Sequence, residues 1–500
     1  MRMSFPLYPC ITAVLTGLFF LAPFAGAQNS PHKPEKENTP PSPLKPCKVP
    51  GVDEEVLCGR LTVFENRQTR SGRKIDLNVV VLPALEQPPR EDPLFDLAGG
   101  PGLAATSAAG GYAKEYRRRR DVVLVDQRGT GRSNPLHCRR DTGPQHFLDE
   151  MYPVEYVRNC RRELEAKADL TQYTTPVAAD DLDEVRAWLG YERINLFGLS
   201  YGTRAALVYM RRHPGRVRSA ILVSGASTNL WIPLHHARGG QRAMNLLLDE
   251  CAADQSCDRA FPRIKQELTT LLAKLERRPA RAEYTLPETG SRVTVEIRRD
   301  IFAEKLRARM YSPEGARQVP FIIHQAARGD FGPFLKMVNP TNRMRPDFLA
   351  DGMYLSVTCA EDTAFIDPAA AARMNKQSFL GNYRVFQQRR ACGIWPRSKI
   401  PGAYQEPIKS NIPVLIISGH MDPVTPPEWG EQVARHLPNS RHVVIRHLAH
   451  IPDGLSNVEC LDKLVLEFYD RGDAKSLDTS CVNQMLPPPF ITEAPSGKGR

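Results

Sequence analysis

The fold is decided by the stretch Ile194-Asn195-Leu196-Phe197-Gly198-Leu199-Ser200-Tyr201-Gly202. Its apolar first half predicts a buried strand, and the segment 203–212 that follows has the pattern of a helix. A serine between two glycines at such a strand-to-helix turn is typical of a nucleophile elbow. The glycines are needed because a Cβ on either side of this sharp turn would meet the neighbouring strand and helix. Ser200 is therefore the candidate nucleophile.

The surrounding sequence predicts an α/β class. Short runs rich in Val, Ile and Leu predict strands that are buried on both faces, at residues 77–82, 122–125, 194–197, 220–223, 414–417 and 443–445. Helical patterns separate several of these runs, at 179–189 and 203–212 for example. This alternation favours a mostly parallel central sheet flanked by helices, which together with the elbow indicates the α/β-hydrolase fold.

Between the fourth and fifth of these runs the pattern changes. Residues 230–404 are helix-like and charge-rich, and strand signals resume only near residue 412. We expect an inserted, mainly helical cap over the carboxyl edge of the sheet, where open α/β sheets bind ligands. The predicted parts are residues 47–229 and 405–481 for the core, 230–404 for the cap and 482–500 for a flexible tail.

The N-terminus has the features of an export signal. Residues 1–27 contain an early Arg2, an uncharged apolar stretch and the cleavage pattern Ala25-Gly26-Ala27. We expect cleavage near Ala27, a Pro-rich linker over 28–46, and a secreted or periplasmic protein without stable insertion in the membrane. An uncleaved anchor remains the alternative reading of the same stretch.

The cysteines agree with an oxidising compartment. Of the eleven cysteines, loss of Cys10 with the signal leaves ten, an even number grouped locally along the chain. This grouping suggests disulfides between neighbours in the sequence, although the sequence cannot fix their connectivity. No Cys or His cluster has zinc spacing, so we expect no metal and no cofactor.

The net charge of +11 does not by itself indicate a nucleic-acid partner. The 67 Lys and Arg residues are spread along the chain and mixed with 56 acidic residues. A basic surface is the simpler interpretation, and we expect no binding of nucleic acid. The sequence does not predict the oligomeric state.

A serine nucleophile needs a base and an acid that orients it, and fold order places the acid and then the base downstream. After the predicted strand 414–417 comes the loop Ser418-Gly419-His420-Met421-Asp422-Pro423, which makes Asp422 the candidate acid. The strand 443–445 leads to His447 and His450, and either could be the base. We favour His450 because it lies beyond the strand end, on a loop that can fold back over the serine.

The oxyanion of an acyl transfer needs backbone N–H donors. One is expected from Tyr201, the residue after the nucleophile. The loop Ala98-Gly99-Gly100-Pro101-Gly102 is expected to supply the other, from Gly100 or from Gly99. The segment 126–133 is expected to border the same site. Its charges either hold this glycine loop, or the segment is a simple turn.

These motifs together resemble the prolyl-aminopeptidase type of serine peptidases, and within it the tripeptidyl-aminopeptidase-like branch. The matching segments are Gly99-Gly100-Pro101-Gly102, Asp126-Gln127-Arg128-Gly129-Thr130-Gly131-Arg132-Ser133, Gly198-Leu199-Ser200-Tyr201-Gly202-Thr203, Asp422-Pro423-Val424-Thr425-Pro426 and His450. The resemblance implies a triad of Ser200, Asp422 and His450 under a helical cap. It also implies release of short peptides from a free N-terminus.

Within the cap, the resemblance implies that Cys359-Ala360-Glu361-Asp362 faces the active site. Glu361, and next to it Asp362, would then hold the amino group of the substrate; the alternative is that both cap a helix or face solvent. One departure concerns specificity: Ala98 stands where prolyl aminopeptidases usually have His, which puts a preference for N-terminal proline in doubt.

Two other functions use the same residues. A secreted carboxylesterase or lipase-like hydrolase would need the same triad, because fold and triad do not distinguish an ester from a peptide bond. A catalytically inactive binding protein could also keep this scaffold. We expect an aminopeptidase that acts on peptide bonds, with a tripeptidyl aminopeptidase as one form of this activity.

Overall fold

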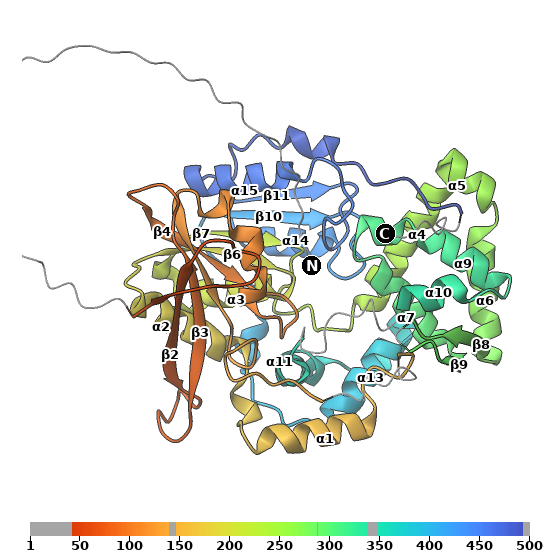
Figure 1. Cartoon of the computed structure of the whole chain (residues 1–500), viewed down its shortest axis with the longest axis horizontal. Helices are drawn as coiled ribbons and strands as arrows, with labels where there is room; N and C mark the ends of the chain where they lie inside the picture. The colour runs from red at the N-terminus through yellow and green to blue at the C-terminus, as the bar shows by residue number, and fades with distance from the viewer. Residues whose placement is uncertain (1–42, 140–146, 288, 339–348, 494–500) are drawn as a thin grey trace, which may run out of the picture.

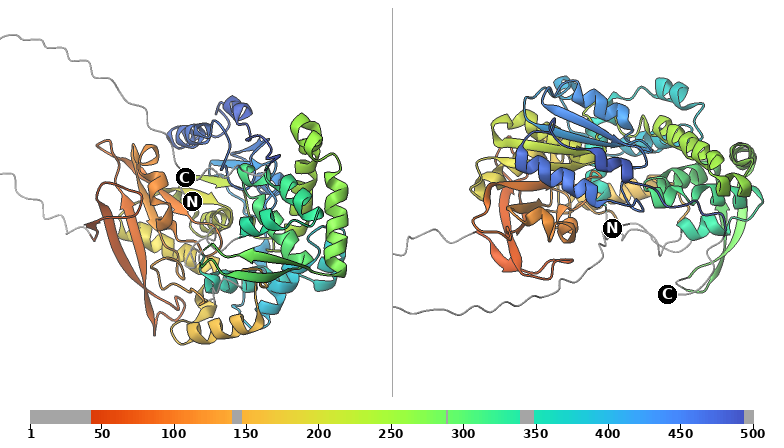
Figure 2. Two further views of the ribbon diagram at one scale, coloured as in Figure 1. Left: turned by 45° about the vertical axis from the view of Figure 1, so that its right-hand side comes forward. Right: turned by 90° about the horizontal axis from the view of Figure 1, so that it is seen from above.

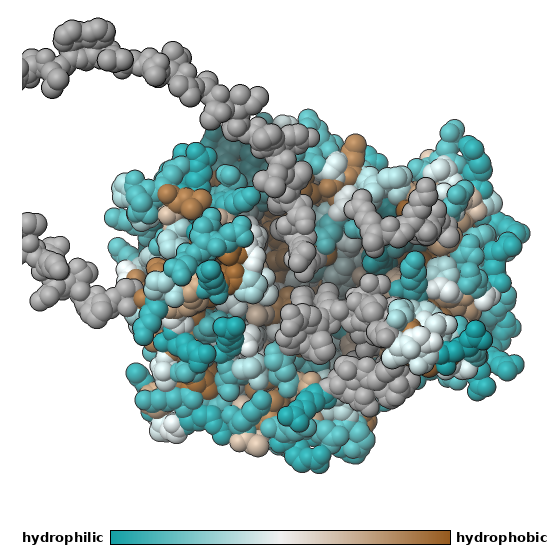
Figure 3. All heavy atoms as spheres, in the orientation of Figure 1, coloured by the Kyte–Doolittle hydropathy of each residue, from teal (hydrophilic) through white to brown (hydrophobic). Residues whose placement is uncertain are grey.

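The computed structural model describes residues 43–139, 147–287, 289–338 and 349–493. The predicted signal segment 1–27 lies outside these ranges, as do most of the predicted linker 28–46 and the end of the predicted tail. Within the described ranges, no helix is both long and apolar enough to cross a membrane. The face seen in Figure 3 is hydrophilic over most of its described area.

One sheet of nine strands forms the centre of the molecule, in the order β1-β2-β3-β5-β4-β6-β7-β10-β11 (Figure 1). The pairs β1–β2, β2–β3 and β3–β5 are antiparallel, and the other five pairs are parallel. The strands are β1 (Lys45–Cys47), β2 (Val56–Phe64), β3 (Lys74–Leu82), β4 (Arg90–Leu97), β5 (Arg120–Val125), β6 (Ile194–Leu199), β7 (Val217–Val223), β10 (Val414–Gly419) and β11 (Ser440–Ile445). All six predicted runs lie within these strands, and the predicted fold class is confirmed.

Both faces of the sheet are covered, as the continuous apolar runs require. In β3, Val79 and Val81 join a hydrophobic cluster with α2 (Thr175–Trp188) and α3 (Tyr201–Arg212). The alternate residues Val80 and Leu82 face the opposite side, in a cluster with α15 (Glu459–Arg471). The period of two along each strand thus divides the core into two layers.

The chain between β7 and β10 is mainly helical. Its elements are α4 (His236–Ala253), α5 (Gln255–Ala260), α6 (Ile264–Arg277), β8 (Ala280–Thr285), β9 (Arg292–Ile297), α7 (Arg299–Arg309), α8 (Pro313–Ala316), α9 (Val319–Ala327), α10 (Gly332–Val338), α11 (Asp351–Glu361), α12 (Pro368–Asn375) and α13 (Tyr383–Cys392). The strands β10 and β11 point toward the green helices of this segment in Figure 1, and Figure 2 shows those helices grouped at one side of the sheet. The exact division at residues 230 and 404 stays a prediction.

This segment does not pack as one unit. Helices α4, α6, α7, α9 and α10 share a hydrophobic cluster with the hairpin β8–β9. Helix α11 instead contributes Met353, Leu355 and Val357 to the cluster between the sheet and α3. The hairpin was not expected from the sequence, because every second residue of β8 is exposed and charged or polar residues interrupt both strands.

Five disulfides join cysteines that are neighbours in the sequence. They are Cys47–Cys58, Cys138–Cys160, Cys251–Cys257, Cys359–Cys392 and Cys460–Cys481. All ten cysteines of the predicted mature chain are therefore paired, and the suggested pairing of neighbours is confirmed.

Candidate active site

Ser200 occupies the turn between β6 and α3 in a strained conformation. Its φ of 57° and ψ of −123° place a non-glycine residue at positive φ, which costs free energy and persists only where the surroundings enforce it. The surroundings do so through backbone hydrogen bonds. The amide of Ser200 donates to the carbonyl of Val223 (2.9 Å), and its carbonyl accepts from the amide of Thr203 (2.9 Å).

The two flanking glycines are required by close approaches of the backbone. A Cβ at Gly198 would lie 2.5 Å from the carbonyl oxygen of Gly202. A Cβ at Gly202 would lie 1.8 Å from the carbonyl oxygen of Leu97, at the end of β4. The reason given from the sequence for these glycines therefore agrees with the packing of the turn.

Asp422 lies in the loop after β10, is fully buried and is held by hydrogen bonds. Its Oδ1 accepts from the amides of Val424 (2.7 Å) and Thr425 (2.9 Å), and its Oδ2 is 2.8 Å from His450 Nδ1 and accepts from the Thr425 hydroxyl. Burial raises the pKa of Asp422, but the charge and hydrogen bond of His450 and the two amides outweigh it. The pKa is therefore below its usual value, and the carboxylate is ionised at neutral pH.

His450 follows β11 and is nearly buried. Because its Nδ1 is bound to Asp422, its Nε2 is the nitrogen left to act as base. Two consecutive residues tie it to the nucleophile: the Ser224 hydroxyl donates to the carbonyl of His450 (3.0 Å), and the carbonyl of Val223 accepts from the amide of Ser200 (2.9 Å). Ser200 and the Asp422–His450 pair thus meet at the same carboxyl edge of the sheet.

His447, the alternative base, does not reach the acid. Its Nδ1 lies 3.6 Å from Glu250 of α4, and burial lowers its pKa. Of the two histidines, the structure brings His450 and not His447 to Asp422.

The glycine loop lies against the nucleophile. A Cβ at Gly99 would contact the Cβ of Ser200 at 3.5 Å, so the backbone at this residue borders the serine. Gly100 has a φ of +113°, and a Cβ there would lie 2.7 Å from the amide nitrogen of Gly102. Tyr201 is the first residue of α3, where amides have no acceptor within the helix. These are the N–H groups that the sequence predicts as oxyanion donors, and their role stays a prediction.

The segment 126–133 lies next to the chain that follows the glycine loop. Asp126 accepts hydrogen bonds from the amide and hydroxyl of Thr106, which follows the glycine loop. Arg128 is completely buried and binds Asp181 with two hydrogen bonds of 2.6 and 2.8 Å. Asp126 thus binds the chain that follows the glycine loop, and Arg128 binds α2. The role of this segment in holding the glycine loop stays a prediction.

Glu361 lies at the end of α11 and is fully buried. Its Oε1 accepts from the amide of Thr175 (2.6 Å), and its Oε2 accepts from the Thr175 hydroxyl (2.7 Å) and from the hydroxyl of Tyr404. The Thr175 hydroxyl also lies 2.7 Å from the hydroxyl of Tyr201. Burial raises the pKa of Glu361, although nearby Arg204 opposes this. The structure thus brings Glu361 to the elbow through Thr175, and both of its oxygens already have protein partners.

Asp362 is also fully buried, 2.9 Å from the guanidinium of Arg204 on α3. Burial raises the pKa of this carboxyl, and Arg204 opposes the rise. Neither acidic residue faces solvent, contrary to one alternative read from the sequence. Their role as ligands of a substrate amine stays a prediction.

Two residues that support the base were not singled out from the sequence. Thr425 donates to Asp422 through both its amide and its hydroxyl, and its presence in the quoted segment Asp422 to Pro426 was the available signal. The carbonyl of Tyr311 accepts from the amides of His450 and Ile451 (3.0 and 2.9 Å), and the rings of Tyr311 and His450 meet edge-on with centroids 5.0 Å apart. Nothing local in the sequence marks Tyr311, because its partner is far along the chain.

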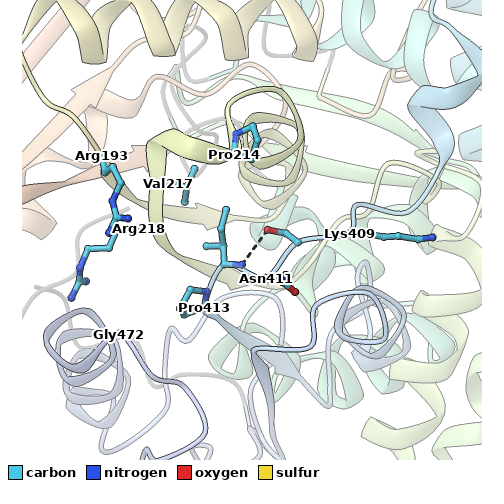
Figure 4. A pocket seen from close by; sticks show the side chains of 10 residues that line it. Arg193, Pro214, Val217, Arg218, Lys409, Asn411, Pro413 and Gly472 are labelled. Atoms are coloured by element: carbon cyan, nitrogen blue, oxygen red, sulfur yellow. Dashed lines mark hydrogen bonds between the residues drawn. The ribbon is translucent and has the colours of Figure 1, made fainter.

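A hollow of about 750 Å³ lies away from these residues (Figure 4). It is lined by Val217, which begins β7, and by Pro413, which precedes β10, so it belongs to the amino edge of the sheet. Ser200 and Asp422 follow the carboxyl ends of their strands, which is the edge where such sheets bind ligands. Among the described residues, no group of three or more His, Cys, Asp or Glu side chains could hold a metal ion.

Two family descriptions match the chain. Residues 100–290 match the family described as "alpha/beta hydrolase fold", and residues 377–481 match the family described as "TAP-like protein". The first match contains Ser200 and the second contains Asp422 and His450.

Curated relatives match over part of their length. The serine protease Hip1 of Mycobacterium tuberculosis is 30% identical over 237 residues, which cover 42% of this chain and 44% of that protein. The tripeptidyl aminopeptidase of Streptomyces lividans is 29% identical over 199 residues, which cover 35% of this chain and 36% of that protein. The matched region thus spans less than half of the length of either relative.

Among solved structures, the proline iminopeptidase of Mycobacterium smegmatis is similar, with a TM-score of 0.38 and 17% identity, over 84% of this chain and 100% of that one. The family matches and the named relatives confirm the resemblance to peptidases of the α/β-hydrolase fold that the motifs indicated.

Proposed function

We propose that this chain of the α/β-hydrolase fold, whose named relatives include a serine protease and a tripeptidyl aminopeptidase, is an exported serine aminopeptidase, with tripeptides as candidate products. The single observation that carries this proposal is the buried Asp422–His450 pair, joined at 2.8 Å, at the same sheet edge as the strained Ser200. An ionised acid, a base with a ring nitrogen that the acid does not occupy, and a half-buried serine hydroxyl are the three parts that acyl transfer needs.

In the proposed reaction the Ser200 hydroxyl attacks the scissile carbonyl while His450 Nε2 takes its proton. Asp422 keeps the proton of His450 on Nδ1 and stabilises the imidazolium. The negative charge on the carbonyl oxygen is held by the amides of Tyr201 and of Gly100 or Gly99. His450 then returns the proton to the departing amine, which leaves an acyl group on Ser200. Water, deprotonated by His450, releases the acyl group and restores the serine.

Requirement for a free N-terminus is what separates an aminopeptidase from the alternatives. The test compares a tripeptidyl p-nitroanilide with its N-acetylated form. We expect cleavage of the free form and a large loss on acetylation, and equal cleavage of both would refute the aminopeptidase. Preferential hydrolysis of p-nitrophenyl esters over both would favour the carboxylesterase alternative.

An inactive binding protein is distinguished by labelling. A fluorophosphonate probe is expected to label the wild-type chain and not the Ser200→Ala variant, because the probe reacts only with an activated serine. Failure to label the wild type would favour a binding role. Ser224→Ala is the control for labelling of a different serine. It removes the hydroxyl that contacts the backbone of His450 and leaves Ser200 in place, so this variant should still be labelled.

Two features support the proposal that the protein is exported: its paired cysteines and the signal-like segment at its N-terminus. Five disulfides are the state of a protein that matures outside a reducing compartment. We expect cleavage near Ala27 and a mature enzyme in the periplasm or the medium, with residues 230–404 as a cap over the site. Intact-mass spectrometry of the exported chain tests the cleavage: a mass that includes residues 1–27 would contradict it.

A further inference from the structure

Two arginines, the buried Arg307 and the partly buried Arg384, share one carboxylate close to His450. Arg307 of α7 binds Glu304 with two hydrogen bonds of 2.6 and 3.0 Å, and Arg384 of α13 lies 3.8 Å from the same carboxylate. Within the part of the chain that the structure describes, the ion pairs of both arginines go to Glu304 alone. The cluster Glu304–Arg307–Arg384 therefore carries one uncompensated positive charge.

Part of this cluster lacks hydrogen-bonding partners. Arg384 Nη2 donates to the Tyr354 hydroxyl (3.2 Å) and Nη1 contacts Met151 Sδ. The buried Nε faces Glu304 at 3.8 Å, too far for a hydrogen bond, and makes no hydrogen bond among the described residues. His236, the first residue of α4, is 4% exposed, and neither of its ring nitrogens has a partner there. Buried donors without acceptors and a buried unpaired charge are both costly, so this cluster is a candidate for completion by a bound group.

The cluster is one side chain away from the candidate base. The Arg307 guanidinium lies 5.3 Å from the centre of the Tyr311 ring and donates to the Tyr311 hydroxyl (3.3 Å). The other contact of that ring is His450, at 5.0 Å between centroids. His236 is likewise close enough to Arg307, Arg384 and His450 that their charges, after burial, lower its pKa well below the usual value. His236 is therefore a neutral donor beside two cations.

We propose that Arg384 and His236 bind a carboxylate of the peptide substrate, on the leaving side of the scissile bond. The proposal rests on the proposed aminopeptidase function. A guanidinium with one N–H that makes no hydrogen bond, beside an imidazole whose two nitrogens are unpartnered within the described ranges, can bind a carboxylate, which would also neutralise the surplus charge of the cluster. The leaving side follows from the chemistry, because the base that hands its proton to the departing amine must face that part of the peptide.

Two sources can supply such a carboxylate: the C-terminus of a short peptide, or an Asp or Glu side chain after the scissile bond. In the first case the enzyme measures peptide length, because the carboxylate lies a fixed distance from the cleaved bond. In the second case it selects an acidic residue within longer peptides. The two sources are separated by the choice of substrate.

The test uses peptides with a free N-terminus in matched pairs, with products identified by mass spectrometry. One pair consists of short peptides that end in a carboxylate or in an amide. The other pair consists of C-terminal amides that carry Glu or Gln after the cleaved bond. We expect kcat/KM to be about tenfold or more higher for the carboxylate member of at least one pair, the size of one charge-assisted hydrogen bond. In Arg384→Gln the ratio within that pair should fall close to one.

A matched control lies on the same helix. Arg390→Gln also removes one positive charge from α13, but this residue pairs with Glu150 rather than with the cluster. The carboxylate-to-amide ratio should stay as in the wild type. Equal kcat/KM within both pairs for the wild type, or the same loss of ratio in both variants, would overturn the carboxylate site.

Binding to Ser200→Ala keeps this inference separate from the proposed function. Isothermal calorimetry with the same peptide pairs should give a Kd about tenfold lower for the carboxylate member, and Arg384→Gln in the same background should remove the difference. Equal affinities would overturn the inference even if the wild type cleaves peptides. A clear preference without any peptide cleavage would instead refute the aminopeptidase and leave the carboxylate site standing.

Discussion

Replacement of Asp422 by Asn tests the triad without changing its shape. Three protein donors fix the orientation of the side chain: the amides of Val424 and Thr425 on Oδ1 and the Thr425 hydroxyl beside Oδ2. In Asp422→Asn the amide oxygen must face the two backbone N–H groups, because an NH2 group there would meet two donors. The new NH2 group then points at His450 Nδ1, 2.8 Å away in the wild type.

This orientation reverses the tautomer of His450. Nδ1 must now accept a hydrogen bond, so the ring proton moves to Nε2, the nitrogen that should accept the proton of Ser200. Reversal of the tautomer in a triad of this kind costs about 10⁴-fold in kcat, or about 5 kcal/mol of transition-state stabilisation. We expect a loss of this size at neutral pH, with KM nearly unchanged.

The assay is the hydrolysis of a tripeptidyl p-nitroanilide, with thermal unfolding to show that the variant is folded. Thr425→Val serves as the graded control, since it removes one hydroxyl donor but keeps the ionised acid, and it should cost far less. A loss in Asp422→Asn of less than about tenfold, in a folded protein, would refute the assigned acid.

Three further predictions concern stability. Gly202→Ala should unfold the chain or lower the free energy of unfolding by more than about 3 kcal/mol, since the new Cβ would lie 1.8 Å from the Leu97 carbonyl oxygen. Gly215→Ala is the control and should change the melting temperature little, because no atom lies within 4 Å of its Cβ. Similar melting temperatures of both variants would contradict the packing argument. Burial raises the pKa of Asp96 to about 7, although the Tyr112 hydroxyl donates a hydrogen bond to it. The contribution of protonated Asp96 to the free energy of unfolding is therefore complete at low pH and is lost as the pH rises from about 4 to 7. Asp96→Asn should raise the melting temperature more at pH 8 than at pH 5, and an equal rise at both pH values would show that Asp96 does not cause the pH dependence. Cys359→Ser with Cys392→Ser opens a loop with a separation of 33 residues between α11 and α13, and denaturant unfolding should show a loss of up to about 4 kcal/mol; an unchanged free energy of unfolding would contradict this.

The parts of the site that the sequence predicted are those with a local signal. The elbow could be predicted because the two glycines around Ser200 form a short sequence motif, although the clash that requires Gly202 is with the distant Leu97. The central strands could be predicted because both of their faces are apolar. Asp422 and His450 followed from the order of acid and base along the chain. The hairpin β8–β9 was not predicted, because half of its residues face solvent.

The environment of Glu361 could not be predicted, because it depends on contacts between distant segments. Its hydrogen-bond partner Thr175 is 186 residues away, and Arg204, beside Asp362, lies on the elbow helix. The sequence of an acidic pair near a helix end is the same whether the pair binds a substrate amine or a buried threonine. Only the packing of α11 against α3 distinguishes these surroundings.

That packing also divides the segment between β7 and β10 into two functional parts. Helix α11 is bound to the elbow through Glu361 and Asp362 and shares the hydrophobic core of the sheet, so it cannot move without disturbing Ser200. Helices α4 and α7 pack in a second hydrophobic cluster, which reaches the loops of the active site through Met421 and Ala449. The ion pair between Glu304 on α7 and Arg384 on α13 crosses this boundary, and the disulfide Cys359–Cys392 ties α13 to α11. A carboxylate bound there would neutralise the surplus charge at the seam and hold α7, and with it Tyr311 against His450, in the arrangement that the base requires.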